Sequence, residues 1–431
     1  MTEIALHAFR ATTQALPVSL PRLFRRLLAF AGPGWMIAVG YMDPGNWATD
    51  IAAGSAFGYK LLFVVALAGL AGMLFQMLSA RLGLVTGLDL AQIGRQRFNP
   101  TVNMMLWLLA EIGIIACDVA EIVGTAIALH LLIGLPLLAG VIASLGLTIL
   151  MLSVERHGLR MLEATIAVLV LTVIGCLGFE VLLAQPSWLA VAGGLVPDVG
   201  ALATPGAAVL AIGIIGATVM PHNLYLHGAL VKRHHHPQRP ATRAELRAVS
   251  ADSNIALIGA FLVNAAILIL AAATFHATGQ QNVAGLVDAQ ALLVPILGSA
   301  AAIVFALALL IAGQNSTVTA TLAGQVVMEG FTNLRLSPAV RRLITRAIAI
   351  VPAAAITAIG GEHGAESLLV LSQVVLCLQL PFAVVPLVMF TADRRVMGAL
   401  RAPIWMTISG ATLALTLIAA NGVMLWSVIA G

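Results

Sequence analysis

Long apolar stretches follow one another along the chain, and mostly short polar connections separate them. A helix that crosses a lipid bilayer needs roughly 20 consecutive, mainly apolar residues. Eleven stretches of the sequence come close to that length. We therefore predict eleven spanning helices, at residues 28–54, 60–84, 102–133, 136–153, 163–184, 207–231, 253–276, 295–322, 341–360, 366–391 and 403–429.

Charged residues are too scarce for a water-soluble fold. Of the 431 residues, 60% are hydrophobic and only 9% are charged, whereas soluble domains average about 25% charged residues. The formal net charge of +4 does not indicate nucleic-acid binding, because the basic residues lie in short clusters between apolar stretches. The sequence predicts an all-α, polytopic membrane protein whose surroundings are the lipid bilayer.

The placement of Lys and Arg predicts the orientation of the helices. Cytoplasmic loops of membrane proteins carry an excess of these two residues. If the N-terminus is inside, Lys60 is the only one of the 22 basic residues that falls outside. We therefore expect residues 1–27 to form a cytoplasmic N-terminal tail, and the C-terminus to be external.

Two of the predicted helices carry matching interruptions. The first contains Asp43-Pro44-Gly45-Asn46 and the sixth contains Met220-Pro221-His222-Asn223, so that a Pro-x-Asn core recurs in both. Proline removes a backbone donor and breaks the helix, although single prolines often only kink membrane helices. Paired interruptions at matching positions instead indicate a substrate site at the membrane midplane.

The distance between the interruptions predicts an inverted repeat. Helices 1 and 6 are five spans apart and therefore cross the membrane in opposite directions. We predict a 5+5 repeat, with a first repeat at 28–184, an external loop at 185–206, a second repeat at 207–391, and an inner loop with helix 11 at 392–431.

The residues at the interruptions favour a metal cation. A buried Asp43 needs a cationic partner, and no Lys or Arg lies at that depth of the spans. Asp43 and Asn46 offer oxygen, whereas Met220 offers a thioether, and soft sulfur beside oxygen favours Mn²⁺, Fe²⁺ and later metals over Mg²⁺ or Ca²⁺. Backbone carbonyls freed near Gly40 and Ala217 can complete the set.

Further polar residues inside the spans are candidates for proton transfer. Asp118 and Glu121 are three residues apart on one helix face, and histidines such as His222 and His227 titrate near neutral pH. Each of them also fits a plain hydrogen bond between helices. The same holds for Gln373 and Asn264, which could contact the metal site.

Other features give no sign of an enzyme or a cofactor. The sequence contains no His-Glu-x-x-His motif, phosphate-binding glycine loop or nucleophile elbow. The run His234-His235-His236 lies in a basic loop and is interpreted as solvated. The three cysteines have no paired spacing and are interpreted as buried apolar residues.

At these motifs the sequence resembles the Nramp family, specifically its bacterial proton-coupled manganese transporters. Asp43-Pro44-Gly45-Asn46 is similar to the first-helix motif of the family. Gly216 to Asn223, followed by Leu226-His227, is similar to its sixth-helix motif. The stretch Ala312 to Thr317, with the nearby Met328-Glu329-Gly330, resembles its eighth helix.

The resemblance implies a leucine-transporter-like inverted-repeat fold, alternating access, and symport of Mn²⁺ or Fe²⁺ with protons in the bacterial inner (plasma) membrane. It implies a monomer without a cofactor. The metal ligands that it implies are Asp43, Asn46, Met220, Ala217, Gly40 and Gln373. The proton pathway that it implies contains Asp43, Asp118, Glu121, His222, His227, Arg341 and Arg342.

The sequence departs from the family pattern at three positions. Cys117 stands where threonine is frequent, Gly228 where serine is frequent, and Gly40 where alanine is usual. None of these changes removes an implied ligand side chain. Cys117, however, is the neighbour of Asp118, a residue of the implied proton pathway.

Two other functions are compatible with parts of the pattern. An amino-acid or sodium-coupled symporter can use the same fold, but Asp43 would repel the carboxylate of its substrate. A cation channel would need no proton coupling and would show far higher throughput than a carrier.

Overall fold

The computed structural model describes residues 32–155, 159–204, 206–234, 240–281, 283 and 285–429. The predicted tail at 1–27, and His235 and His236 of the basic loop, lie outside these residues.

Within the described residues the chain is helical and contains no strand, which confirms the all-α prediction for that part. The helices of the first part are α3 Pro33–Gly40, α4 Pro44–Phe57, η1 Gly58–Leu61, α5 Leu62–Thr86, α6 Leu90–Arg97, α7 Pro100–Ile133, α8 Leu137–Glu155, α9 Leu159–Ala184, α10 Trp188–Gly194 and η2 Val199–Ala203. Those of the second part are α11 Ala207–Thr218, α12 Pro221–Val231, η3 Lys232–His234, α13 Arg243–Ala271, η4 Ala272–His276, α14 Leu286–Leu297, α15 Ser299–Thr332, α16 Pro338–Ala392, α17 Arg394–Met397, η5 Gly398–Leu400 and α18 Ile404–Ile429.

Seven of the described helical segments are long and apolar enough to cross a membrane, or eight if a pair bent by 119° between α9 and α10 counts as one span. Two of the seven are unusually long: Pro44–Thr86 contains 43 residues and Val340–Ala392 contains 53. At a rise of 1.5 Å per residue, even 43 residues extend about 65 Å, far more than one bilayer core. Each of these two contains a glycine with positive φ, Gly58 and Gly361, and so has room for two crossings. The count of eleven stays a prediction.

Helix α13 differs from the predicted range of 253–276, because it begins at Arg243. Thr242 and Glu245 form a capping box at its start, in which each side chain accepts a hydrogen bond from the backbone of the other residue. The first turns of α13 are therefore polar and precede its apolar part.

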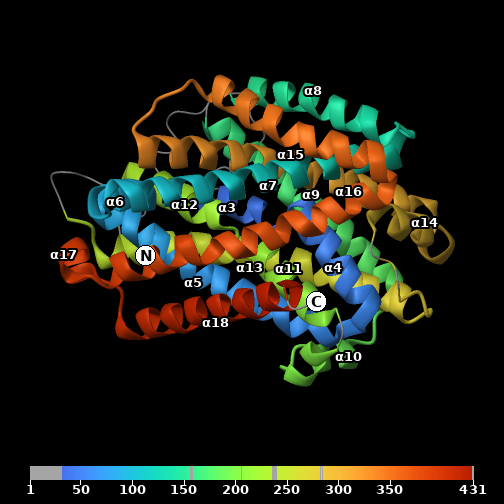
Figure 1. Cartoon of the computed structure of the whole chain (residues 1–431). Coiled ribbons are helices and arrows are strands. Elements are labelled where there is room, and N and C mark those ends of the chain that lie inside the picture. The colour runs from blue at the N-terminus through green and yellow to red at the C-terminus, as the bar shows by residue number, and fades with distance from the viewer. Residues whose placement is uncertain are drawn as a thin grey trace, which may run out of the picture.

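Both predicted interruptions occur at the predicted prolines. The chain leaves helical geometry between α3 and α4 and again between α11 and α12. In Figure 1 the pair α3–α4 runs from left to right and the pair α11–α12 from right to left. In keeping with opposite directions, α3 contacts α12 and α4 contacts α11. The repeat that would relate the two halves stays a prediction.

The broken helices lie inside a shell of longer helices. Helix α13 packs against α3, α4 and α5, while α15 and α16 both pack against α7 (Figure 1). Helix α18 lies at the rim of the bundle and exposes large apolar side chains, as a lipid-facing helix would: Ile404, Trp405, Ile408, Leu415, Ile418, Val423, Leu425 and Trp426.

Candidate metal-binding site and adjoining polar network

Asp43 caps the second piece of the first broken helix. Its backbone is extended, with φ −70° and ψ 165°, and Pro44 follows at the first helical position. Asp43 Oδ1 accepts hydrogen bonds from the backbone N–H of Asn46 at 2.8 Å and from Asn46 Nδ2 at 2.9 Å. The other carboxylate oxygen, Oδ2, is buried without a hydrogen-bond partner. One oxygen thus holds the helix start, and the second remains available to a ligand.

The second broken helix brings a sulfur atom to its interruption. Helix α11 ends at Thr218, and Met220 is the residue before Pro221 and the start of α12. Met220 is fully buried. Its Sδ accepts a weak hydrogen bond from Asn223 Nδ2 at 3.8 Å, which leaves the polarisable thioether able to contact a soft cation.

The two interruptions touch each other. Asn46 Nδ2 donates to the carbonyl oxygen of Ala217 at 3.1 Å, so the start of α4 meets the end of α11. At the other side of the crossing, a Cβ on Gly40 would lie 2.0 Å from Asn223 Nδ2. The glycine at position 40, where the family pattern has alanine, therefore gives the Asn223 side chain its room.

Gln373 of α16 reaches the same crossing. A Cβ on Gly45 would lie 1.8 Å from Gln373 Nε2, so the amide lies directly over the first interruption. Of the implied ligands, Asp43, Asn46 and Ala217 are joined by hydrogen bonds. Gln373 packs against Gly45, while Gly40 and Met220 both contact the Asn223 side chain.

Several buried oxygens around the crossing have no hydrogen-bond partner. They are Asp43 Oδ2, Asn223 Oδ1, Asn264 Oδ1 and Gln373 Oε1. Buried polar atoms are rarely left unsatisfied in folded proteins, because each one costs free energy. A bound cation would satisfy such oxygens. In the described part of the chain no three His, Cys, Asp or Glu side chains gather as a metal site, so the candidate set relies on one carboxylate with neutral ligands.

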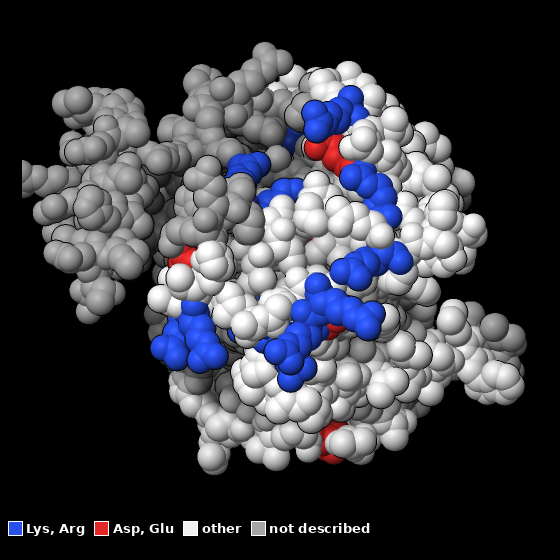
Figure 2. Space-filling model, turned by 90° about the vertical axis from the view of Figure 1, so that its left-hand side faces the viewer, with Lys and Arg blue, Asp and Glu red and all other residues white. Residues whose placement is uncertain are grey.

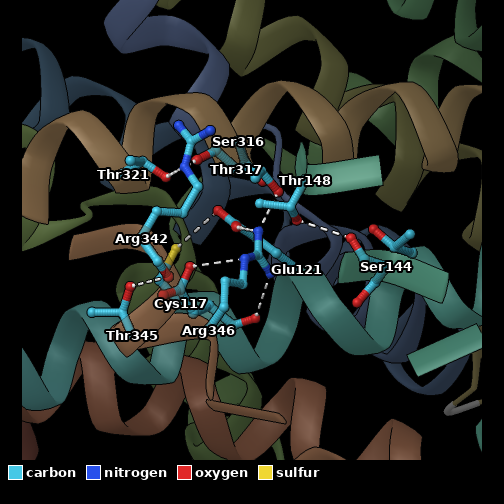
Figure 3. Close-up of polar contacts among 12 residues, drawn as sticks. Cys117, Glu121, Ser144, Thr148, Ser316, Thr317, Thr321, Arg342, Thr345 and Arg346 are labelled. Atoms are coloured by element: carbon cyan, nitrogen blue, oxygen red, sulfur yellow. Dashed lines mark hydrogen bonds and ion pairs between the residues drawn. The ribbon is translucent and has the colours of Figure 1, made fainter. Parts of the chain in front are cut away.

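Arg346 of α16 is the centre of an adjoining network (Figure 3). Its Nη2 lies 2.7 Å from Glu121 Oε2 and donates to Thr317 Oγ1 at 2.7 Å. Its Nε lies 3.7 Å from Asp118 Oδ1. Arg346 and Glu121 are both almost fully buried. The structure therefore brings Asp118 and Glu121 together around one guanidinium group.

Cys117 joins this network to the second interruption. Its Sγ donates to Glu121 Oε1 at 3.6 Å (Figure 3). The same sulfur lies 3.8 Å from His222 Nε2. His222 is two residues from Met220. A chain of polar contacts thus runs from α12 through α7 to α16, and it passes through the thiol that departs from the family pattern.

Arg341 and Arg342 have partners different from those of Arg346. Arg342 Nε donates to Thr321 Oγ1 at 2.7 Å, and Arg341 Nη2 lies 2.5 Å from Glu111 Oε2. The sequence had suggested these two arginines for the proton route, whereas Arg346 had been used only for the orientation. One signal did exist: Arg346 follows Arg342 by four residues and so lies on the same helix face.

His227 belongs to a separate set of contacts. Its Nδ1 lies 2.9 Å from Gln76 Oε1, and its Nε2 lies 3.1 Å from Ser253 Oγ. Gln76 Nε2 in turn donates to the hydroxyl of Tyr41 at 3.0 Å. Asn264 Nδ2 donates to the Tyr41 carbonyl at 2.9 Å and lies 3.3 Å from Asn46 Oδ1. His227 is thus connected to the first interruption through hydrogen bonds, although no direct contact links it to His222.

Comparisons with known proteins support a common family. Residues 34–427 match the family model of natural resistance-associated macrophage protein-like proteins, Nramp. A protein of Xanthomonas campestris named "divalent metal cation transporter MntH" is 54% identical over 403 residues, which cover 93% of this chain and 91% of that protein.

Solved structures agree with this match. The Eremococcus coleocola manganese transporter has a TM-score of 0.86 at 38% identity, with 96% of this chain and 90% of that chain covered. Mhp1, a transporter of the nucleobase-cation-symport-1 family, has a TM-score of 0.62 at 15% identity and 92% coverage of both chains, which shows a shared fold alone. Because the family model and the 54% identical relative both span most of its length, this chain belongs to the Nramp family.

Proposed function

We propose that this chain is a divalent metal cation transporter that imports Mn²⁺, and also Fe²⁺, by symport with protons through alternating access. The observation that carries the proposal is the contact between the two broken helices. One interruption holds a buried carboxylate oxygen of Asp43 without a hydrogen-bond partner, and the other holds the fully buried sulfur of Met220. The names of the Xanthomonas and Eremococcus relatives agree with a metal substrate.

In the proposed site the metal binds between the two interruptions. Asp43 Oδ2 supplies the negative charge, Met220 the sulfur, and Ala217 a carbonyl oxygen, with Gly40 and Gln373 contributing in other states. Asn46 now directs its Nδ2 toward Asp43 and Ala217. Its amide must turn over so that the oxygen, which now faces Asn264, faces the cation.

In the proposed proton route, Asp43 takes up a proton at the site, and the buried network passes it on. His222 and Cys117 connect the interruption to Glu121, and Arg346 holds Glu121 and Asp118 together. Arg341, Arg342 and His227 set the charge and hydrogen bonding around this route. Carboxylates and histidines serve as proton relays in other membrane transporters.

Uptake into proteoliposomes with simultaneous recording of internal pH tests the proposal. We expect Mn²⁺ and Fe²⁺ to enter with acidification of the lumen, and Mg²⁺ and Ca²⁺ to enter far more slowly. Amino-acid uptake without metal uptake would instead favour a symporter of amino acids. Metal currents of single-channel size would favour a channel.

The proposal also includes the setting of the protein. We propose a monomer in the bacterial plasma membrane, with its N-terminus cytoplasmic and its C-terminus external. The gathering of Lys and Arg at one end of the helices supports this orientation (Figure 2).

A further inference from the structure

Four arginines line one cavity at the basic end of the protein. The cavity has a volume of about 670 Å³ and lies between the last turns of α5, the first turns of α13 and the connection from η5 to α18. Arg81, Arg243, Arg247 and Arg401 line it, and none of its lining residues is acidic. Its volume is in the range of sites that hold small molecules, about 300–1,000 Å³.

The positive charges of this cavity lack partners. Arg243 and Arg247 are four residues apart and lie on one face of α13; like Arg401, they are exposed. Among the described residues no acidic side chain forms an ion pair with Arg243, Arg247 or Arg401. Like charges held together in this way repel one another, and a bound anion would relieve the repulsion.

Arg81 fixes one wall of the cavity. Its Nη1 donates to the carbonyl oxygen of Leu400 at 2.9 Å and so ties α5 to the connection before α18. Its Nε is buried and has no hydrogen-bond partner. Arg81 therefore keeps an unsatisfied guanidinium N–H, which adds to the need for negative charge near this wall.

One side of the cavity is apolar and faces outward. Trp405 lines the cavity and is 56% exposed, and its neighbour Ile404 at the start of α18 is 72% exposed. Exposed tryptophans are typical of the membrane–water boundary. The surface around the cavity carries many Lys and Arg and few Asp and Glu (Figure 2). A cationic interior beside an apolar rim fits an amphiphile better than it fits a free inorganic anion.

We infer that this cavity binds the phosphate headgroup of an anionic phospholipid of the leaflet at the basic end, with the acyl chains lying along α18 beside Trp405. Basic pockets between membrane helices bind anionic headgroups in this way. The bound lipid would join α5, α13 and α18 at one end of the bundle. The inference does not depend on the proposed substrate, because it concerns a separate surface.

Native mass spectrometry of the full-length protein in detergent tests this inference with phosphatidylglycerol, phosphatidylcholine and inorganic phosphate as probes. We expect phosphatidylglycerol to bind more tightly than phosphatidylcholine. The triple variant Arg243→Gln, Arg247→Gln and Arg401→Gln should lose about fivefold in affinity per arginine, thus about a hundredfold in total. Arg81 stays unchanged, because its hydrogen bond to Leu400 supports the fold.

A matched control removes the same number of charges elsewhere. Arg97→Gln, Arg335→Gln and Arg394→Gln change exposed arginines that do not line the cavity and should leave the affinity within about twofold of the original, because surface charges that do not contact the headgroup are screened by salt. The triple variant Arg243→Lys, Arg247→Lys and Arg401→Lys should retain most of the binding, which would show that the fold is intact. Equal losses in the glutamine variant and the control would overturn the inference. So would equal binding of both lipids, or full displacement of phosphatidylglycerol by millimolar phosphate.

Discussion

Asp43 has two separable tasks at the first interruption. Oδ1 caps α4, while Oδ2 is free for a cation. Asp43→Asn keeps an oxygen for the cap, since Asn and Asp are similarly good N-caps, but removes the charge. We expect the melting temperature to change little and Mn²⁺ uptake by proteoliposomes to fall by at least about a hundredfold, because charge at this depth is worth several kcal/mol.

Asp43→Ala should abolish uptake as well, and in addition destabilise α4 by about 1 kcal/mol through loss of the cap. Substantial Mn²⁺ uptake by either variant would contradict the proposal that Asp43 binds the metal.

Met220 is the second residue of the proposed metal site. Met220→Ala removes the soft ligand, so that Mg²⁺ and Ca²⁺ should compete with Mn²⁺ more effectively. The measurement is inhibition of Mn²⁺ uptake by a series of Ca²⁺ concentrations. Met397→Ala is a suitable control, because Met397 is also buried but lies in α17, away from the interruptions. Both variants should lose about 2–5 kcal/mol of stability through the cavity they create. Unchanged selectivity in Met220→Ala contradicts the ligand role.

We expect the side chain of Asp118 to affect proton transport more than metal binding. Asp118→Asn retains the shape of the side chain but cannot ionise. Metal-stimulated acidification of the lumen should fall well below its original rate, while Mn²⁺ affinity measured by calorimetry stays close to that of the unchanged protein. Equal losses in both measurements would give Asp118 a structural role.

At this scale the sequence predicted the residues of the motifs but not their contacts. Proline, glycine and a lone buried aspartate have local consequences, so Asp43 and Met220 could be identified without a fold. Arg346 could not, because its long side chain reaches from α16 to α7, and only packing decides which carboxylate it meets. Cys117 could be named as an unusual residue, but its place between Glu121 and His222 depends on the packing of α7 against α12.

At the scale of elements, the interruptions were predictable and the long helices were not. A proline excludes the hydrogen bond of its own nitrogen, but Pro352 and Pro381 lie inside α16 without ending it. The breaks before Pro44 and Pro221 were predictable because the Pro-x-Asn core recurs at both. The π-helical turn at Ala272–His276 has no comparable sequence signal. Gly361 divides α16 through its φ of 58°, and only the predicted spans at 341–360 and 366–391 had suggested a boundary there.

Close packing between α11 and α16 gives a prediction for these elements. A Cβ on Gly216 would lie 2.2 Å from the carbonyl oxygen of Gln373 and 2.8 Å from Cys377 Cβ. The carbonyl belongs to the helix backbone and cannot turn away, so Gly216→Ala must move α11 relative to α16. We expect a destabilisation of about 1–3 kcal/mol together with slower Mn²⁺ uptake, because Gln373 lies over the metal site.

Gly175→Ala in α9 is the control for this effect. No heavy atom lies within 4 Å of the added Cβ, so the change should be neutral or stabilise the helix by up to about 1 kcal/mol. Thermal unfolding in detergent measures both variants. Equal melting temperatures would show that α11 and α16 tolerate a larger separation.

For the whole molecule, the apolar stretches of the sequence predicted an all-α membrane protein, and the placement of Lys and Arg predicted its orientation. Family membership, which the motifs suggested, is confirmed over residues 34–427. How the helices pack could not be derived from the stretches alone, because an apolar helix is compatible with many neighbours. The crossing of α3–α4 with α11–α12, whose interruptions hold a carboxylate and a thioether, depends on that packing.

The orientation of the whole chain can be tested by labelling with a membrane-impermeant maleimide. Arg97 lies at the end of α6 and Val196 lies beyond α10; both are exposed, and the basic-residue pattern places them on opposite sides of the membrane. In a Cys176→Ser background, Cys117 and Cys377 remain buried and unreactive. Intact cells should label Val196→Cys at once and Arg97→Cys only after permeabilisation. The reverse pattern would contradict the proposed orientation, and with it the side from which metal and protons are proposed to enter.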